Sequence, residues 1–286
     1  TEIYTLSLHD ALPIYIIEVL GDHHLAANFK RIMGWFCISA VFWITGAILQ
    51  GEWQILLWII AAICDYTAPM HGFALPRLGR SDSSKEWTIE GHHLVERCQL
   101  FVIIAFGETL LMTGASLSEV EEWTPLVIIS AVISFIGSLA MWWVYFDVSS
   151  EAGSRKIQEV KDPGKLGLIY NAIHIVLVGA LIICAVGDEL IVAHPEQEMR
   201  AEVVFVLIIG PIVYILANSI YKYVTCRMLP LSHIIAVIAL ALLLPWPYHI
   251  SLLTMNILVT SVFIFVIVFD MLFPNKGFKI KWEPKI

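Results

Sequence analysis

Long apolar stretches without charged residues alternate with short polar segments along this chain. A membrane-spanning helix needs about 20 apolar residues, and most of the stretches reach that length. The longest are found between Arg31 and Glu52, from Trp123 to Phe146, from Leu166 to Gly187, from Val203 to Tyr221 and from Met228 to Phe269. Pro245-Trp246-Pro247 interrupts the last stretch, which is long enough for two helices joined by a tight turn.

Two further segments have the same character but carry one acidic residue each. They are Trp53 to Met70, with Asp65, and about His93 to Ala115, with Glu108. All of these stretches are apolar on every side rather than along one stripe, which is typical of helices within a membrane. The pattern predicts an all-α integral membrane protein with about eight transmembrane helices.

The basic residues support this count, because they fall on alternate sides of the predicted segments. Of the 17 Lys and Arg residues, only Arg200 lies on the side opposite to the others if all eight segments span. Acidic residues such as Glu119, Asp188 and Glu196 fall in the opposite loops. The positive-inside rule then places both termini of this multi-pass protein in the cytoplasm.

Composition excludes several other classes of protein. Hydrophobic residues make up 58% of the 286 residues, charged residues only 15%, and the mean hydropathy is +0.79. A net charge of −8 leaves no basic surface for nucleic acid. The five cysteines show no C-x-x-C spacing, which favours small side chains in helix packing over disulfides or zinc. We therefore expect the lipid bilayer as the main partner and no cofactor, and a homo-oligomer is compatible with the pattern.

The first fourteen residues do not fit the membrane pattern. Thr1 to Ile14 reads TEIYTLSLHDALPI, which is polar and lacks a helical period. This string resembles a translated sequencing-adapter fragment, so we expect residues 1–14 to be a non-native tail whose deletion leaves membrane insertion and stability unchanged. The alternative is a short natural tail. No basic segment followed by a short apolar run indicates a signal peptide.

Polar residues within the third predicted helix are the first candidates for function, because such groups are costly in a membrane. Arg97 can reach the inner interface by extending its side chain, but Glu108 lies near the middle of the membrane. The spacing places His93 and Arg97 on one face, and Arg97 and Glu108 about 16 Å apart along the axis. A metal site at His92, His93 and Glu96 is weakly supported, and a role in capping and orienting the helix is favoured.

The fifth predicted helix carries Tyr170, Asn171 and His174. His174 lies at a depth similar to Glu108, so the two side chains form a candidate proton or ion site if their helices meet. The alternative is a histidine bonded to a neighbouring hydroxyl or carbonyl group. Pro211 is expected to kink the sixth helix, and the Asn218 and Asn256 amides are expected to form hydrogen bonds between helices.

Three motifs resemble the bacterial low temperature requirement A family. The family pattern H-x-x-E-R-F-x-L-F-x-I-I-x-L-G-E is matched by His93, Glu96, Arg97, Leu100, Phe101, Ile103, Ile104, Gly107 and Glu108. Met141 to Asp147 is similar to the W-W-x-Y-F-D segment, and Tyr170 to Glu189 to a Y-x-x-x-H helix ending in a Gly-acid pair. Cys98 stands in place of the usual Phe, and Val176 in place of a frequent Pro.

The resemblance also implies a domain organisation. Family members begin with an additional block of helices that contains an E-L-F-F-D-x-V-F motif, which this sequence lacks. On that basis, residues 15–90 are a remnant of a first half, with two transmembrane helices and a cytoplasmic loop. Residues 91–275 form a six-helix half, and residues 276–286 a basic cytoplasmic tail. By analogy alone, two such halves resemble repeat-built transporters.

These observations favour an ion- or proton-coupled transporter or channel, with Glu108 and His174 as central groups and a small ion or proton as substrate. The alternative is a non-transporting membrane protein that supports envelope function or growth in the cold, in which the polar groups pair with one another. An enzyme is disfavoured, because H-E-x-x-H, G-x-S-x-G and phosphate-loop motifs are absent from the sequence.

Overall fold

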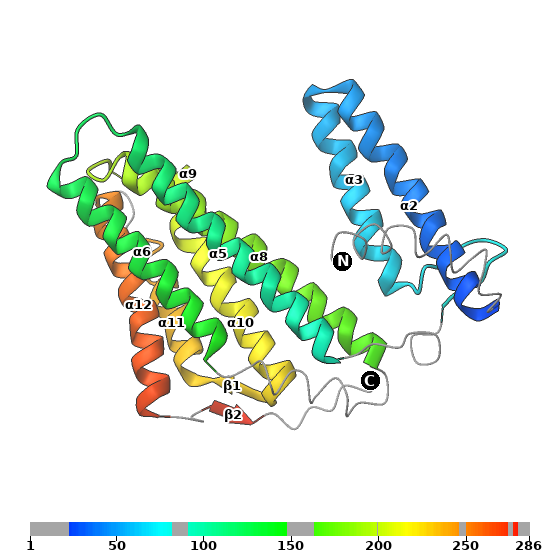
Figure 1. Cartoon of the computed structure of the whole chain (residues 1–286). Coiled ribbons are helices and arrows are strands. Elements are labelled where there is room, and N and C mark those ends of the chain that lie inside the picture. Colours follow the sequence, from blue (N-terminus) through cyan, green and yellow to red (C-terminus); the bar gives the residue numbers. More distant parts are fainter. Residues whose placement is uncertain are drawn as a thin grey trace, which may run out of the picture. The chain divides into compact units, whose positions relative to one another are not determined.

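The computed structural model describes residues 23–81, 91–147, 163–198, 200–245, 250–273 and 277–279, and the predicted tail 1–14 lies outside them. The described chain is almost entirely helical, as predicted (Figure 1). It divides into two compact units. The first comprises residues 1–89 with 161–168, and the second residues 90–160 with 169–286.

The first unit is built on a hairpin of α2 (His23–Leu49) and α3 (Gly51–Met70) (Figure 1). Gln50 and Gly51 join the helices with positive φ angles of 55° and 65°, a conformation that glycine adopts without strain. The Trp43 indole N–H donates to Asp65 Oδ2 at 3.0 Å, so the acidic residue of this apolar segment has a partner inside the hairpin.

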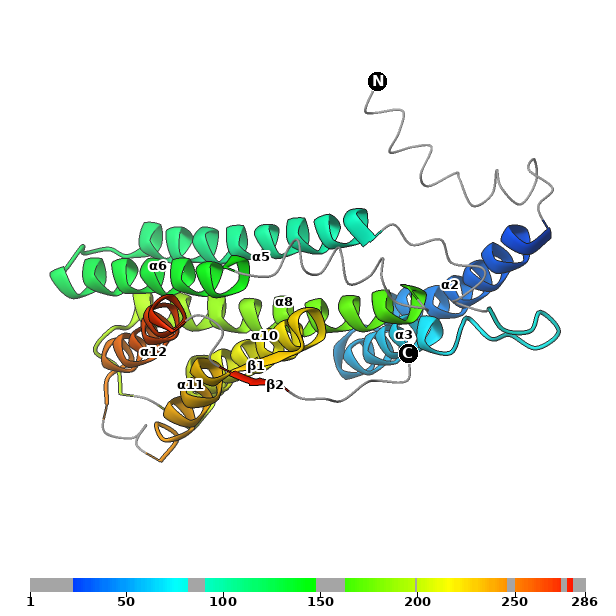
Figure 2. The same cartoon turned by 90° about the horizontal axis from the view of Figure 1, so that it is seen from below.

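The second unit contains five long helical segments and one short helix. The long segments are α5 (Gly91–Glu119), α6 (Pro125–Phe146), α8 (Pro163–Ala193, whose residues 163–168 belong to the first unit), α9 (Ala201–Val204) continued through the π-helical turn η1 (Phe205–Ile209) into α10 (Gly210–Cys226), and α12 (Leu252–Leu272). The short helix is α11 (Leu231–Ala241). Thr124 caps α6 and Ser251 caps α12 through their side-chain oxygens. Viewed from below, α5 lies beside α6 (Figure 2).

Two sets of backbone contacts define the ends of this helical unit. At the strand end, β1 (Met228–Pro230) pairs antiparallel with β2 (Gly277–Lys279) (Figure 2). At the loop end, Glu198 forms a bridge with Ser251, and the Leu252 N–H donates to the Gln197 carbonyl at 2.9 Å. The full length of α12 separates the two ends, so the chain between Pro230 and Ser251 must travel from one end to the other.

Seven helices, rather than eight, are long and apolar enough to cross a membrane in the part of the chain that the structure describes. The exception is α11, whose 11 residues extend about 16 Å, against about 30 Å for the hydrocarbon core of a bilayer. Strand pairing uses the residues before Leu231, and turns occupy Leu242–Pro245. The prediction of eight full-length spanning helices is therefore corrected to seven and a short one.

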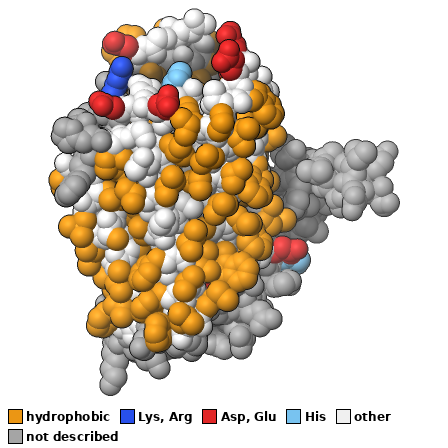
Figure 3. Space-filling view, turned by 90° about the vertical axis from the view of Figure 1, so that its left-hand side faces the viewer, with side chains coloured by type: hydrophobic (Ala, Val, Ile, Leu, Met, Phe, Trp, Pro, Cys, Tyr) orange, Lys and Arg blue, Asp and Glu red, His pale blue; other side chains and the backbone are white. Residues whose placement is uncertain are grey.

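The surface of the protein agrees with a membrane environment. Large hydrophobic side chains are exposed on most of the long helices. On the face drawn in Figure 3, they cover the middle, whereas charged side chains gather mainly at one end. Of the long apolar helices, α8 and the η1–α10 segment are the most buried. The interior of the second unit is therefore centred on these two.

Candidate functional site

His174 lies in a closed cluster of aromatic side chains from three helices. Its Nε2 is 2.8 Å from the Tyr145 hydroxyl of α6, and its Nδ1 is 2.8 Å from the backbone carbonyl of Tyr170. The Tyr170 hydroxyl in turn meets the hydroxyl of Tyr221 on α10 at 3.0 Å. All four side chains are at most 1% exposed. Both nitrogens of the buried histidine are thus satisfied.

The partners of His174 determine its tautomer. A carbonyl oxygen only accepts, so Nδ1 must carry the proton, and Nε2 of the neutral ring then accepts from the Tyr145 hydroxyl. A second proton would have to displace this donated hydrogen bond. The arrangement is therefore that of a satisfied interior histidine, which was the alternative reading of this residue. Beside it, Asn171 Oδ1 accepts a long hydrogen bond of 4.0 Å from the Cys98 thiol of α5.

The candidates on α5 lie on the opposite side of that helix from its buried residues. Glu108, Arg97, Glu96 and His93 are all exposed in the described chain. His93 Nδ1 is 3.7 Å from Glu96 Oε2, and Glu108 has no ion pair or hydrogen bond with a described residue. Within the second unit, Glu108 is thus an exposed side chain, and the hydrogen-bond partners of His174 are Tyr145 and Tyr170 rather than Glu108.

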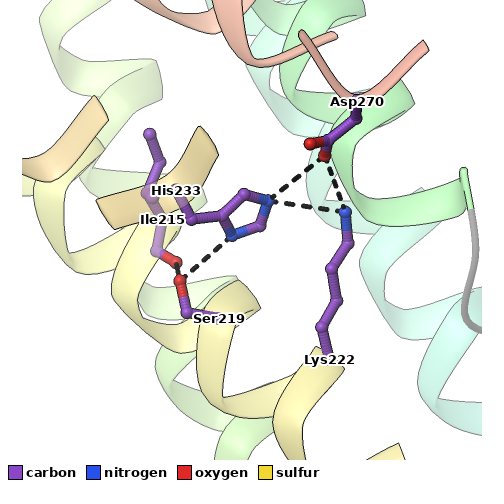
Figure 4. Close-up of polar contacts among 5 residues, drawn as sticks. All are labelled: Ile215, Ser219, Lys222, His233 and Asp270. Carbon is purple, nitrogen blue, oxygen red and sulfur yellow. Dashed lines mark hydrogen bonds and ion pairs between the residues drawn. The ribbon is translucent and has the colours of Figure 1, made fainter. Parts of the chain in front are cut away.

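A second polar cluster, which the sequence analysis missed, joins α10, α11 and α12 (Figure 4). Lys222 Nζ is 3.5 Å from Asp270 Oδ2 and 3.4 Å from His233 Nε2. His233 Nδ1 is 3.0 Å from the Ser219 hydroxyl. His233 is fully buried and Lys222 is 4% exposed. Lys222 was expected in a loop, but it lies within α10, because the helix continues past Tyr221 to Cys226.

The hydrogen bonds of this cluster also fix the proton on its histidine. The Ser219 hydroxyl donates to the Ile215 carbonyl at 2.7 Å, so His233 Nδ1–H must donate to Ser219. His233 Nε2 is then free of a proton and accepts from the Lys222 ammonium group. A proton added at Nε2 would turn this attraction into a contact between like charges, with Asp270 4.0 Å away as the nearest compensating group.

Asp188 is the second charged residue that the structure moves from a predicted loop into a helix. It lies in α8, which extends to Ala193, and is 7% exposed. Near it, the Asn256 amide donates to Ser134 Oγ at 2.9 Å, which confirms the predicted hydrogen bond between helices for Asn256. The Asn218 amide instead is fully buried and meets hydrogen-bond geometry with no other described residue. The kink at Pro211 stays a prediction, and the structure places the π-helical turn η1 directly before Gly210 and Pro211.

Among the residues that the structure describes, no group of three or more His, Cys, Asp or Glu side chains could hold a metal ion. The structure gives no support to a metal site at His92, His93 and Glu96. The His93 and Glu96 side chains are exposed, and the His92 side chain is not among those that the structure describes.

Taken together, the apolar helices and the polar groups buried between them define a multi-span membrane protein. Comparison with known sequences gives its family. The profile of the bacterial low temperature requirement A protein (LtrA) matches residues 12–268, and the chain belongs to this family. This confirms the resemblance seen in the motifs.

One curated relative extends the comparison. The chain is 34% identical over 220 residues to an uncharacterized protein of Rhizobium meliloti (strain 1021), an alignment that covers 76% of this chain and 53% of the relative. The chain thus spans about half the length of the relative that it matches. No solved structure matches the chain significantly.

Proposed function

We propose that this protein is part of an ion- or proton-coupled transporter or channel of the bacterial inner membrane. The observation that carries the proposal is the cluster of Ser219, Lys222, His233 and Asp270 (Figure 4). Ionisable groups within membrane segments are costly and commonly mark pathways for ions or protons. This cluster gathers three of them on three different helices.

The chemistry of the cluster explains how a proton would act on the protein. His233 offers one unprotonated nitrogen, and the charged groups that face it are Lys222 of α10 and Asp270 of α12. Protonation would repel Lys222 and draw Asp270 toward the imidazolium ring. Because each group belongs to a separate helix, the change favours a different packing of α10, α11 and α12, which is the kind of two-state element that couples a proton to movement.

The proposed topology follows from the same helices. The passage of the chain from the strand end to the loop end between Pro230 and Ser251 counts as one crossing, although α11 is short. With the seven long helices, this gives eight crossings, which is an even number and leaves both termini on one side. The distribution of Lys and Arg favours the cytoplasm for that side.

One observation favours the alternative of a non-transporting membrane protein that supports envelope function or growth in the cold. Both nitrogens of His174 have hydrogen-bond partners within the protein, as a scaffold role would require. Transport through the second unit must therefore depend on groups other than His174. The Lys222 cluster supplies such groups, and for this reason we prefer the transport proposal.

The test is proton and cation flux into proteoliposomes that contain the purified protein. His233→Asn retains a donor near the position of Nδ1 for Ser219 but has no nitrogen that accepts a proton at neutral pH. We expect it to lower proton-coupled flux by about a hundredfold or more, the usual size for the loss of a proton-transfer group. His194→Asn changes an exposed histidine at the end of α8 and serves as the matched control.

Two outcomes would contradict the proposal. Equal flux in His233→Asn and the wild type, at matched protein level, would remove the cluster from the mechanism. A correctly folded wild type that carries no flux of protons or of any common monovalent cation would favour the non-transporting alternative.

A further inference from the structure

A small cavity lies between α6, α8, η1 and α12, one to two helical turns from the loop end of the second unit. Its volume is about 30 Å³, enough for one or two water-sized occupants. The polar side chains that line it are Ser138, Asp188, Asn256 and Thr260. The cavity is thus a polar site in the interior of an apolar helical unit. None of the residues of the Lys222 cluster lines it.

The carboxylate of Asp188 in this cavity has no countercharge among the described residues. It is 7% exposed, faces the hydroxyl groups of Ser134 and Ser138, and forms no ion pair with a described Lys, Arg or His. Hydroxyl groups do not neutralise a buried charge, and an uncompensated carboxylate inside a membrane protein is costly. A positive charge is the missing component.

Two neighbouring side chains supply further oxygen atoms. Ser138 lines the cavity and is 4% exposed, and its Oγ faces the Asp188 carboxylate without meeting hydrogen-bond geometry to any described residue. On α12, Thr260 approaches α6 closely at Gly137, where a Cβ atom would lie 3.0 Å from Thr260 Oγ1. Because residue 137 is a glycine, the hydroxyl group of Thr260 can lie close to α6 and beside the same cavity.

The π-helical turn adds a backbone carbonyl. The Gly210 N–H bonds to the Phe205 carbonyl, five residues back, and Pro211 then has no N–H to offer. The carbonyl of either Val206 or Leu207 is consequently left without its helical donor, and both residues line the cavity. A Cβ atom on Gly187 would lie 3.6 Å from the Val206 oxygen, so this oxygen faces α8 next to Asp188.

We propose that this cavity binds one small monovalent cation of sodium size, with Asp188 as the charged ligand. Carboxylate, hydroxyl, amide and carbonyl oxygens are the ligands of hard cations. A single carboxylate balances one positive charge, so the occupied site is neutral, whereas a divalent ion would leave excess charge in the membrane interior. The small volume admits one water-sized monovalent cation and excludes a bulky organic cation such as choline.

The position of the site gives the cation a route from water. Asp188 lies about 8 Å along α8 from the end of that helix at Ala193. Exposed Glu196 and Glu198 lie at the same loop end, where negative charge raises the local concentration of cations. The inference concerns binding and stands independently of whether the protein transports.

The test is equilibrium binding of radioactive sodium (²²Na⁺) to the purified full chain in detergent, with choline chloride keeping the ionic strength constant. We expect saturable binding at a single class of site, which lithium displaces and choline does not. Asp188→Asn should weaken the affinity by about tenfold or more, and Ser138→Ala by about threefold. The matched control is Asp147→Asn, which changes an exposed aspartate at the end of α6 and should bind as the wild type does.

The inference is overturned if the folded wild type shows no saturable sodium binding at either pH 6 or pH 8.5, because Asp188 would then be balanced by a proton or by water alone. Equal affinity in the wild type and Ser138→Ala would also overturn it, and this second variant keeps the test decisive if Asp188→Asn fails to fold. Sodium binding without any flux would support the site while contradicting the proposed transport, so the two failures are distinguishable.

Discussion

His174 and Asp188 lie on the same helix, α8, about 21 Å apart along its axis. They differ in whether the surrounding residues supply their hydrogen-bond partners and balance their charge. Both are buried, at 1% and 7% exposure. His174 has a donor and an acceptor for its two nitrogens, whereas Asp188 faces only hydroxyl groups and a cavity. Burial of an ionisable group therefore does not by itself indicate function. An ionisable group becomes a candidate for function when the neighbouring residues leave its hydrogen bonds unformed or its charge unbalanced.

The largest effect on stability is expected at His174, whose two ring nitrogens both have hydrogen-bond partners. His174→Ala removes a ring packed against three tyrosines and leaves the Tyr145 hydroxyl and the Tyr170 carbonyl without their partner. We expect a loss of about 3 kcal/mol in the free energy of unfolding, measured by denaturant unfolding in detergent. Val176→Ala, an exposed position on the same helix, is the control and should cost much less. Equal costs at the two positions would show that the tyrosine cluster is not a stabilising core.

A smaller effect of opposite sign is expected for the buried Asn218 amide, which has no hydrogen-bond partner among the described residues. Asn218→Leu replaces a fully buried polar group by an apolar one of similar size, so we expect a gain of about 1 kcal/mol in unfolding free energy. Asn256→Leu is the matched comparison, because it breaks the hydrogen bond to Ser134 and should destabilise the protein by a similar amount. If both substitutions destabilise, Asn218 has a partner that the described residues do not supply.

The smallest effect on stability is expected at Glu108, which is exposed and without a described partner. Glu108→Gln should change the free energy of unfolding by less than about 0.5 kcal/mol. Under the transport proposal, it should nevertheless reduce ion flux in proteoliposomes, because glutamine keeps the size of the side chain but neither releases a proton nor neutralises a cation. Flux equal to that of the wild type would remove Glu108 from the mechanism.

Much of the fold could be predicted because the apolar stretches are long and the membrane restricts the choice of structure. The stretch from Trp123 to Phe146 corresponds to α6 (Pro125–Phe146) within two residues at its start. The segment after Met228 was predicted less well. Its length suggested two full spanning helices, but strand pairing at Met228–Pro230 and the turns after Ala241 leave a short helix between them.

The candidate site was predicted less completely, for a reason that the charged residues illustrate. A stretch without charges ends at the first charged residue, so Asp188 and Lys222 were assigned to loops. The helices continue past both, because Lys222 has Asp270 and His233 as partners and Asp188 faces a polar cavity. Such partners come from other helices and are not visible in the local sequence. The signal that could have found these residues is their spacing of three or four positions from buried polar residues, such as Ser219 and Asn218 for Lys222.

The comparison between the two polar sites of α8 is tested most directly by thermal unfolding of three proteins in sodium and in choline chloride at equal ionic strength. A ligand that binds only the folded state raises the unfolding temperature as its concentration increases. We predict that sodium stabilises the wild type and His174→Gln by a similar increment, although His174→Gln starts from a lower temperature. Asp188→Asn should show no increment. Sodium stabilisation that persists in Asp188→Asn, or that disappears in His174→Gln alone, would contradict the assignment of Asp188 as the ligand site and of His174 as a structural residue.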